Sequence, residues 1–241
     1  DVKKALNTLH EKFFEKNVKQ INLFIIGIGN VGSKLIDQIE KQTDYLTKKL
    51  KLKLRIIAIS NSKKMLFNES GLRLSNLRED IDRGENSNLD EFFKKIKKLN
   101  LRNSVFIDNT ASSKIAGYYQ NFLKNNISVV TCNKIACSDS YSSYIELKKL
   151  ASKYDTSFLY ETNVGAGLPI IDTLNNLINS GDKINSIQAV LSGSLNYIFN
   201  NFNNSNTFED VVKEAMDKGF TEPNPKIDLS GIDVARKILI L

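Results

Sequence analysis

Two charged residues near the end of the chain, Asp233 and Lys237, have the spacing needed to act together on a carbonyl group. The segment SGIDVARKILIL predicts a helix, and residues four apart on a helix share a face. A carboxylate beside an amine keeps the amine charged and oriented, ready to give a proton to a carbonyl oxygen. An exposed ion pair is the alternative, because other residues form the apolar face of this helix.

A proline-containing stretch precedes this helix and carries two more carboxylates. In GFTEPNPKIDLSG, Glu222 stands before two of the chain's three prolines, which stiffen the loop. Asp228 follows, and Ser230 is predicted to cap the N-terminus of the last helix. The segment from Gly219 to Lys237 thus gathers several candidate chemical groups at one end of the chain.

Three glycines near the other end follow the spacing of a nucleotide-binding turn. In FIIGIGNVG, Gly27 can form the tight turn after a strand, Gly29 lets the backbone approach a pyrophosphate, and Gly32 allows close packing of a helix. The N–H groups at the start of that helix would hold the negative charge. An ordinary glycine turn is the alternative, but the strand before it and the helix after it favour dinucleotide binding.

The end of the next strand-like run indicates which dinucleotide. NAD-binding proteins usually place an acidic residue there on the ribose 2′-hydroxyl, whereas NADP requires cations for its additional phosphate. The sequence AISNSKKM has no acid and offers Ser62, Lys63 and Lys64. The sequence therefore predicts a preference for NADP(H) over NAD(H). The alternative is that the two lysines are ordinary solvated loop residues with no cofactor contact.

Two further strand-like runs end in polar residues, DNTAS and TCNK. Ligands of open α/β folds bind at the carboxyl ends of the strands. Thr110 is therefore a candidate cofactor contact, and Lys134 a candidate for the nicotinamide end or a substrate carboxylate.

The elements that must position these residues alternate between strand and helix. Over residues 19–160, helix patterns separate five apolar runs: INLFIIG, LRIIAIS, SVFIDNT, ISVVTCN and TSFLYE. This alternation predicts an α/β, Rossmann-type, doubly wound parallel sheet with helices on both faces. Residues 1–18 predict an amphipathic linker helix, since apolar residues recur there at helical spacing.

The pattern changes near Tyr160. Residues 161–241 predict an α+β substrate domain, with helices over 169–181, 194–202 and 208–219 and a strand over 183–193. The chain ends at Leu241 inside the last predicted helix.

The composition argues against several classes of protein. The 241 residues are 41% hydrophobic and 25% charged, with no signal-peptide pattern and no apolar stretch long enough to span a membrane. The net charge of +7 comes from dispersed lysines, which suits anionic small ligands better than nucleic acid. Cys132 and Cys137 match neither a disulfide framework nor a zinc site, so we expect reduced thiols and a cytoplasmic protein.

Five segments together make the chain resemble homoserine dehydrogenase, and more closely the dehydrogenase part of bifunctional aspartokinase–homoserine dehydrogenases. They are FIIGIGNVGSKLIDQI, AISNSKKML, YETNVGAGLPIIDTL, LSGSLNYIF and GFTEPNPKIDLSGIDVARKILIL. The resemblance implies reduction of L-aspartate 4-semialdehyde to L-homoserine with NAD(P)H, on the route to threonine and methionine.

The resemblance also implies roles for residues. Lys237 would be the proton donor, Asp233 its partner, and Lys134 a third catalytic residue between cofactor and substrate. Glu222 and Asp228 would bind the substrate. The implied cofactor contacts are Gly27, Ile28, Gly29, Asn30, Val31, Gly32, Ser62, Lys63, Thr110, Lys134 and Gly219.

Further implications concern ions and partners. The carboxylate of Glu161 and the backbone carbonyls of Val164, Ala166 and Leu168 would hold sodium or potassium. Relatives commonly dimerise, and a fused aspartokinase is implied by the opening ALNTLHEKFF. Family members continue beyond the point where this chain stops, so the resemblance implies an incomplete substrate domain. The alternative function is a non-catalytic NADP-binding module of a larger assembly. Asn224 and Lys226 also depart from the residues that relatives often carry.

Overall fold

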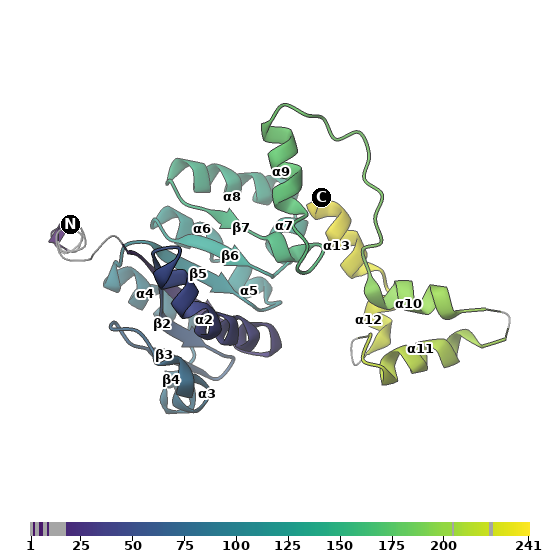
Figure 1. Cartoon of the computed structure of the whole chain (residues 1–241), viewed down its shortest axis with the longest axis horizontal. Coiled ribbons are helices and arrows are strands. Elements are labelled where there is room, and N and C mark those ends of the chain that lie inside the picture. The colour runs from purple at the N-terminus through teal and green to yellow at the C-terminus, as the bar shows by residue number, and fades with distance from the viewer. Residues whose placement is uncertain (1, 3–4, 7–8, 10–17, 204, 222–223) are drawn as a thin grey trace. The chain divides into compact units, whose positions relative to one another are not determined.

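The five strands expected from the apolar runs form the parallel part of one sheet (Figure 1). The computed structural model describes residues 2, 5–6, 9, 18–203, 205–221 and 224–241, so the linker helix expected over 1–18 lies largely outside the described residues. The chain divides into two units, Asp1–Tyr160 and Glu161–Leu241. In the first unit the parallel strands are β2 (Leu52–Ser60), β1 (Lys19–Ile26), β5 (Ser104–Asp108), β6 (Ser128–Thr131) and β7 (Phe158–Leu159), in that spatial order.

Two short antiparallel strands extend this sheet and were not expected from the sequence. They are β3 (Lys64–Phe67), which pairs with β2, and β4 (Glu85–Asn86), which pairs with β3. The order is therefore β4-β3-β2-β1-β5-β6-β7. Asn61 reverses the chain between β2 and β3, because its side-chain oxygen accepts hydrogen bonds from the backbone N–H groups of Lys63 and Lys64.

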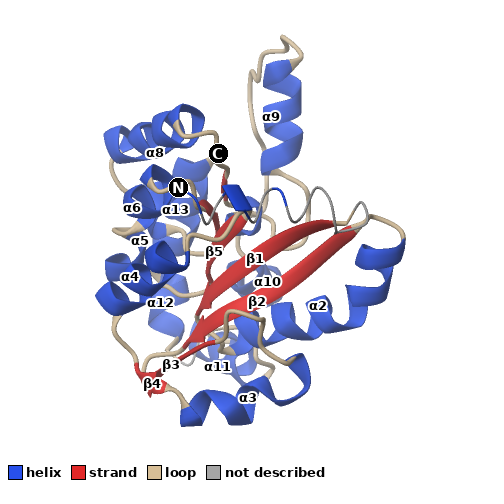
Figure 2. Ribbon diagram, turned by 90° about the vertical axis from the view of Figure 1, so that its left-hand side faces the viewer, coloured by secondary structure: helices blue, strands red, loops and turns tan. Residues whose placement is uncertain are grey.

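The helices cover both faces of the sheet, as expected for a doubly wound fold. β2 and β5 lie on opposite sides of β1, so right-handed crossovers place α2 on one face and the later helices on the other (Figure 2). The helices of this unit are α2 (Asn30–Lys48), α3 (Leu77–Asp80), α4 (Leu89–Leu99), α5 (Ser113–Ala116), α6 (Tyr119–Lys124), α7 (Ile135–Ser138) and α8 (Tyr141–Lys153), with single 3₁₀ turns at Leu74–Asn76 and Ile81–Arg83. The helix pattern SKIAGYYQNFLKNN, residues 113–126 between the third and fourth apolar runs, is divided in the structure between α5 and α6.

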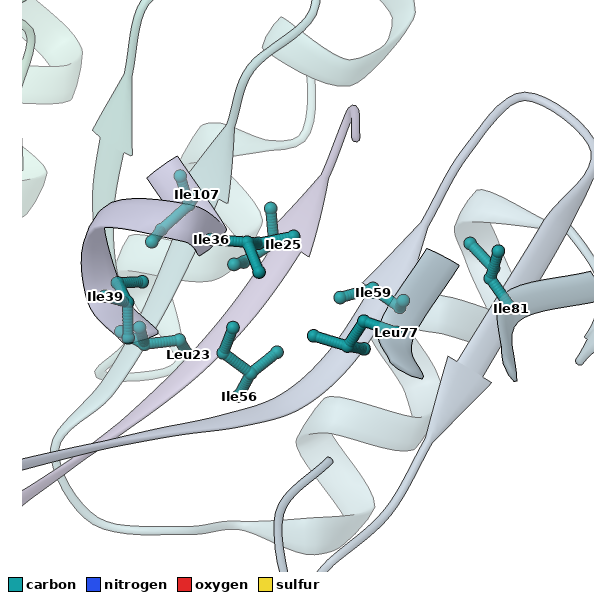
Figure 3. Close-up of a cluster of buried hydrophobic side chains, with 9 residues drawn as sticks. All are labelled: Leu23, Ile25, Ile36, Ile39, Ile56, Ile59, Leu77, Ile81 and Ile107. Carbon is teal, nitrogen blue, oxygen red and sulfur yellow. The ribbon is translucent and has the colours of Figure 1, made fainter. Parts of the chain in front are cut away.

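Alternating residues of β1 supply two cores. Leu23 and Ile25 face α2 in a cluster of nine buried aliphatic side chains (Figure 3). On the other face aromatic rings dominate, and the rings of Phe106 and Phe122 stack with centroids 3.9 Å apart. Burial on both faces explains why the strands read as continuous apolar runs in the sequence.

The described part of the second unit is helical. Its helices are α9 (Ile171–Asn179), α10 (Gly193–Asn201), α11 (Phe208–Asp217), α12 (Pro225–Leu229) and α13 (Ile232–Ile240), after a 3₁₀ turn at Glu161–Asn163. The strand predicted over 183–193 is wrong: residues 182–192 have no regular structure, and most are exposed. A strand needs a hydrogen-bonding neighbour, and no other described segment of this unit provides one. No helix of the described residues is both long and apolar enough to cross a bilayer.

Candidate functional site

In the glycine turn between β1 and α2, neighbouring atoms leave no room for a side chain at Gly27 or Gly32, whereas the space beside Gly29 is open. Gly27 has a φ of +89°, and a Cβ there would lie 2.8 Å from the Thr110 methyl carbon. A Cβ on Gly32 would lie 1.9 Å from the Gly27 carbonyl oxygen. A Cβ on Gly29, in contrast, would meet no heavy atom of the described residues within 4 Å. The space beside Gly29 is therefore available to a ligand.

Helix α2 begins directly at this space. Gly29 occupies the N-cap position and has no side chain with which to accept a hydrogen bond from the first turn. Asn30 and Val31 are exposed in that turn, and Ile28 is half-buried just before it. Backbone N–H groups at the start of a 19-residue helix suit an anion such as a pyrophosphate.

The loop after β2 lies next to this turn, since the Gly27 N–H donates to the Ser60 carbonyl at 2.9 Å. Ser62 and Lys63 are exposed at its tip. Lys64 instead points back to the β4 side, where its Nζ donates to the Gly84 carbonyl at 3.1 Å. The two lysines thus differ in role: Lys63 faces solvent, whereas Lys64 supports the β3–β4 region.

Thr110 and Lys134 follow neighbouring strands at the same edge of the sheet. In the ladder Asp108 pairs with Ile26 on one side and with Thr131 on the other. The loops after β1, β5 and β6 therefore begin at one level. Within the first unit, the predicted cofactor residues of the glycine turn, the β2 loop and these two strand ends meet along this carboxyl edge.

Three buried polar residues at this edge were not among the predicted site residues. Asp108, Tyr119 and Asn133 have at most 2% of their surface exposed and are joined by hydrogen bonds. The sequence signal for Asp108 was an acidic residue placed directly at the end of the apolar run VFID. Asn133 stood beside Lys134 in the quoted TCNK stretch.

Charges at this edge act on the Cys132 thiol. Burial raises the pKa of Cys132 above its usual value, and the Asp108 carboxylate raises it further. The Lys134 ammonium acts in the opposite direction and lowers the pKa of this thiol. Both charges therefore lie within electrostatic range of Cys132. Burial, with the Asp108 carboxylate beside it, also raises the pKa of the Tyr119 hydroxyl.

In the second unit, Lys237 is held by two partners. Its Nζ lies 2.6 Å from Asp233 Oδ2 and donates to the Leu191 carbonyl at 2.7 Å. The side chain of Lys237 is only 18% exposed, against 44% for Asp233. This arrangement differs from an ordinary solvated helix pair, because a distant segment of the chain covers the amine.

The same segment also contacts Asp228. Ser194 Oγ donates to Asp228 Oδ1 at 2.8 Å and lies 3.0 Å from Ser192 Oγ. Ser192 caps α10 by accepting from the Leu195 N–H. The turn from Leu191 to Ser194 therefore connects Asp228 to the Lys237 pair. The sequence predicts LSGSLN as the end of a strand and the start of a helix, and it was not among the predicted site residues.

Other predicted residues of this unit have different placements. Glu222 lies outside the described residues. Ser230 was predicted to be the N-cap of the last helix, but Gly231, with a φ of +70°, holds that position. Ser230 instead ends α12. Gly219 has a φ of +72° and follows the C-cap of α11.

The predicted cation loop begins with a carboxylate that is already engaged. Glu161 Oε1 accepts from the Ile171 N–H at 2.9 Å, and Oε2 accepts from the Asp172 N–H at 2.8 Å. The chain between them turns sharply, with left-handed φ values at Gly165 and Ala166. The described residues contain no cluster of three or more histidine, cysteine, aspartate or glutamate side chains suited to a metal. Each Glu161 oxygen keeps a further lone pair beyond the hydrogen bond that it accepts.

The parallel sheet and the glycine turn define the first unit as a dinucleotide-binding domain of the Rossmann type. Two family models match the chain: "Homoserine dehydrogenase, NAD binding domain" over residues 27–161 and "Homoserine dehydrogenase" over residues 169–241. The chain therefore belongs to the homoserine dehydrogenase family.

Curated relatives and solved structures agree with this assignment. The bifunctional aspartokinase/homoserine dehydrogenase of Buchnera aphidicola subsp. Acyrthosiphon pisum (strain APS) is 44% identical over all of this chain, which covers 29% of that protein. The homoserine dehydrogenase of Schizosaccharomyces pombe is 35% identical over 92% of this chain, which covers 61% of that protein. The structure of a hyperthermophilic archaeal homoserine dehydrogenase mutant in complex with NADPH has a TM-score of 0.79 at 27% identity, covering 92% of this chain and 68% of that one. The chain thus spans less than a third of the bifunctional relative.

Proposed function

We propose that this chain is the dehydrogenase part of an enzyme that reduces L-aspartate 4-semialdehyde to L-homoserine with NADPH. The observation that carries the proposal is the placement of Lys237, whose ammonium is mostly covered and fixed by the Asp233 carboxylate and the Leu191 carbonyl. A fixed ammonium is the group that an aldehyde oxygen requires when its carbon is reduced.

The chemistry divides between cofactor and protein. Bound NADPH supplies the hydride that reduces the aldehyde carbon. Lys237 donates a proton to the aldehyde oxygen, and Asp233 orients the ammonium for that donation. An ammonium has three N–H bonds; two are directed to Asp233 and Leu191, and the third is assigned to the substrate. Glu222 and Asp228 would bind the amino-acid end of the substrate, and Lys134 is proposed as a third catalytic residue.

The cofactor is held by the carboxyl edge of the first unit. The open space beside Gly29 and the start of α2 suit the pyrophosphate. Exposed Ser62 and Lys63 suit the 2′-phosphate of NADPH, and no carboxylate of residues 60–64 would repel it. These features support a preference for NADP(H) over NAD(H).

A sodium or potassium ion is proposed at the turn after β7. Its ligands would be the carbonyl oxygens of Val164, Ala166 and Leu168 with the Glu161 carboxylate, which is the kind of oxygen set that hard cations select. The left-handed residues Gly165 and Ala166 support a turn in which carbonyl groups are redirected.

The chain is further proposed to act as part of a longer, dimeric protein that includes an aspartokinase. The support is that several relatives are named as bifunctional aspartokinase/homoserine dehydrogenases. The cytoplasmic location expected from the sequence stays a prediction; the Arabidopsis relatives are named as chloroplastic.

The test combines turnover and binding in one preparation. NADPH consumption is followed with aspartate semialdehyde and potassium present, and NADPH binding is measured separately by fluorescence. Turnover would support the enzyme. Binding without turnover would favour the non-catalytic NADP-binding module. If the chain shows no turnover and no NADPH binding, both functions are excluded.

A further inference from the structure

A buried carboxylate lies beneath the carboxyl edge of the sheet and joins three elements. Asp108 ends β5 and is fully buried. Its Oδ1 accepts a hydrogen bond from the Thr110 N–H at 2.8 Å. Its Oδ2 accepts from the Tyr119 hydroxyl at 2.6 Å and from Asn133 Nδ2 at 3.0 Å. The donors belong to the loop after β5, to α6 and to the loop after β6.

A second set of contacts fixes Asn133 itself. Its backbone N–H donates to Thr131 Oγ1 at 2.8 Å, and that hydroxyl lies 2.8 Å from the Tyr119 hydroxyl. Its Nδ2 also donates to the Ser112 carbonyl at 3.0 Å, and its Oδ1 accepts from the Ile135 N–H at 3.1 Å. The backbone N–H, Nδ2 and Oδ1 of Asn133, the residue immediately before Lys134, therefore all have hydrogen-bond partners.

The loop after β5 is fixed on a second side by the glycine turn. A Cβ on Gly27 would lie 2.8 Å from the Thr110 methyl carbon and 2.9 Å from the Asn109 backbone. Thr110 thus rests against Gly27 while its N–H is held by Asp108. Any movement of Asp108 would be transmitted to Thr110 and, through Asn133, to Lys134.

Filling the space at this cluster does not require polar side chains. Burying a carboxylate is unfavourable unless hydrogen bonds compensate, and apolar side chains of similar volume would fill the space without that cost. A satisfied polar network differs from apolar packing in that it sets directions and distances between the elements it joins.

We propose that Asp108, Tyr119 and Asn133 are positioning residues that fix the loops at 109–112 and 132–135 relative to the glycine turn, and so set where Thr110 and Lys134 meet cofactor and substrate. The inference rests on the proposed function, because it assigns a purpose to the placement of those two residues. It adds three side chains that are buried beneath those two loops.

The test removes one hydroxyl and keeps its ring. Tyr119→Phe preserves the aromatic contacts with Phe106 and Phe158 and deletes the donor to Asp108. The matched control is Tyr144→Phe, which deletes a hydroxyl in the same unit that pairs with the Tyr160 hydroxyl at 2.7 Å instead of with Asp108. Tyr119→Phe removes a bond to a fully buried carboxylate, so it should lose more overall stability than the half-buried control, and the comparison therefore rests on which amides change.

Two readouts separate positioning from stability. Hydrogen–deuterium exchange in Tyr119→Phe should accelerate at the amides of Thr110, Asn133 and Ile135, with the β1 amides unchanged. The Kd for NADPH should rise about tenfold, the loss expected for one misplaced contact region. In Tyr144→Phe the same amides and the Kd should stay as in the parent chain.

Equal exchange and equal Kd changes in the two variants would overturn the proposal. If the parent chain binds no NADPH, the proposed function fails, while the exchange comparison still decides whether the cluster fixes the loops. If Tyr119→Phe does not fold, Asn133→Ala takes its place. Faster exchange at Thr110 in that variant would support the proposal, and unchanged exchange there would overturn it.

Discussion

Lys237 and Asp233 form an ion pair in which the cation is more buried than the anion. The nitrogen and Oδ2 are 2.6 Å apart, and the lysine side chain is 18% exposed against 44% for the aspartate. The Leu191 carbonyl, 46 residues away in sequence, completes the enclosure of the amine. The position of the Lys237 amine is therefore fixed by a tertiary contact as well as by its helical spacing from Asp233.

The first prediction concerns this amine. Lys237→Ala should lower kcat for aldehyde reduction by at least about a hundredfold, the scale of general-acid catalysis. The Kd for NADPH should change by less than about twofold, because the cofactor is assigned to the other unit. The control is Arg236→Ala, an exposed cation on the same helix. Equal loss of turnover and NADPH binding in Lys237→Ala would contradict the assigned role.

The second prediction compares two glycines of one turn. Gly32→Ala would place its Cβ 1.9 Å from the Gly27 carbonyl oxygen, so the free energy of unfolding should fall by at least about 2 kcal/mol. Gly29→Ala should cost less than about 1 kcal/mol, since its Cβ enters open space, yet it should weaken NADPH binding. Urea unfolding and NADPH titration of both variants measure this; unaltered NADPH affinity in Gly29→Ala would count against the pyrophosphate site.

The third prediction separates two adjacent lysines. Lys63→Ala should weaken NADPH binding about tenfold and leave NADH binding unchanged, because only NADPH carries the 2′-phosphate. Lys64→Ala loses its hydrogen bond to the Gly84 carbonyl, so its effect should fall on stability and on both cofactors alike. Titration of each variant with both nucleotides checks the prediction. Identical selectivity in the two variants would argue against a special role for Lys63.

The fourth prediction uses the Cys132 thiol as a reporter of Lys134. Burial and Asp108 raise the pKa of this thiol, while Lys134 lowers it. Removing Lys134 should raise the pKa further and leave less reactive thiolate at about pH 8. In a Cys137→Ser background, Lys134→Ala should therefore slow alkylation by iodoacetamide, whereas Lys149→Ala on α8 should not. A faster reaction in Lys134→Ala would contradict the sign of this interaction.

The fifth prediction concerns the carboxylate that begins the second unit. Glu161→Ala removes acceptors for the Ile171 and Asp172 N–H groups, so the free energy of unfolding should fall by about 1–2 kcal/mol. If Glu161 also helps to hold a cation, the stimulation of turnover by potassium should be lost in Glu161→Gln. Retention of the full potassium response in both variants would remove Glu161 from the ligand set.

The sequence was most informative where one physical cause dominated. Strands buried on both faces appear as continuous apolar runs, so all five parallel strands were predicted. The steric demands at Gly27 and Gly32 are local to the turn, and the motif expresses them directly. Helix-spaced charges likewise placed Asp233 and Lys237 together.

Features that depend on distant partners could not be predicted in the same way. Strands β3 and β4 are short; a turn at Asn61 returns β3 to β2, and β4 pairs with β3 only after a longer connection. The segment 183–193 has strand-like composition, but composition cannot supply a neighbouring strand. Ser230 is a good capping residue by type, whereas the backbone conformation at Gly231 decides the helix start. The Asp108 cluster joins residues from three separate elements.

The contact between Leu191 and Lys237 has a consequence for experiments that scan the protein by mutation. Leu191 contributes its carbonyl oxygen, which every amino acid possesses. A side-chain scan would therefore report tolerance at position 191 even where the contact is essential. The contact can be tested by converting the 191–192 amide to an ester, which weakens the Leu191 carbonyl as a hydrogen-bond acceptor. Such a backbone change measures the contribution of this carbonyl to holding Lys237, which no side-chain substitution removes.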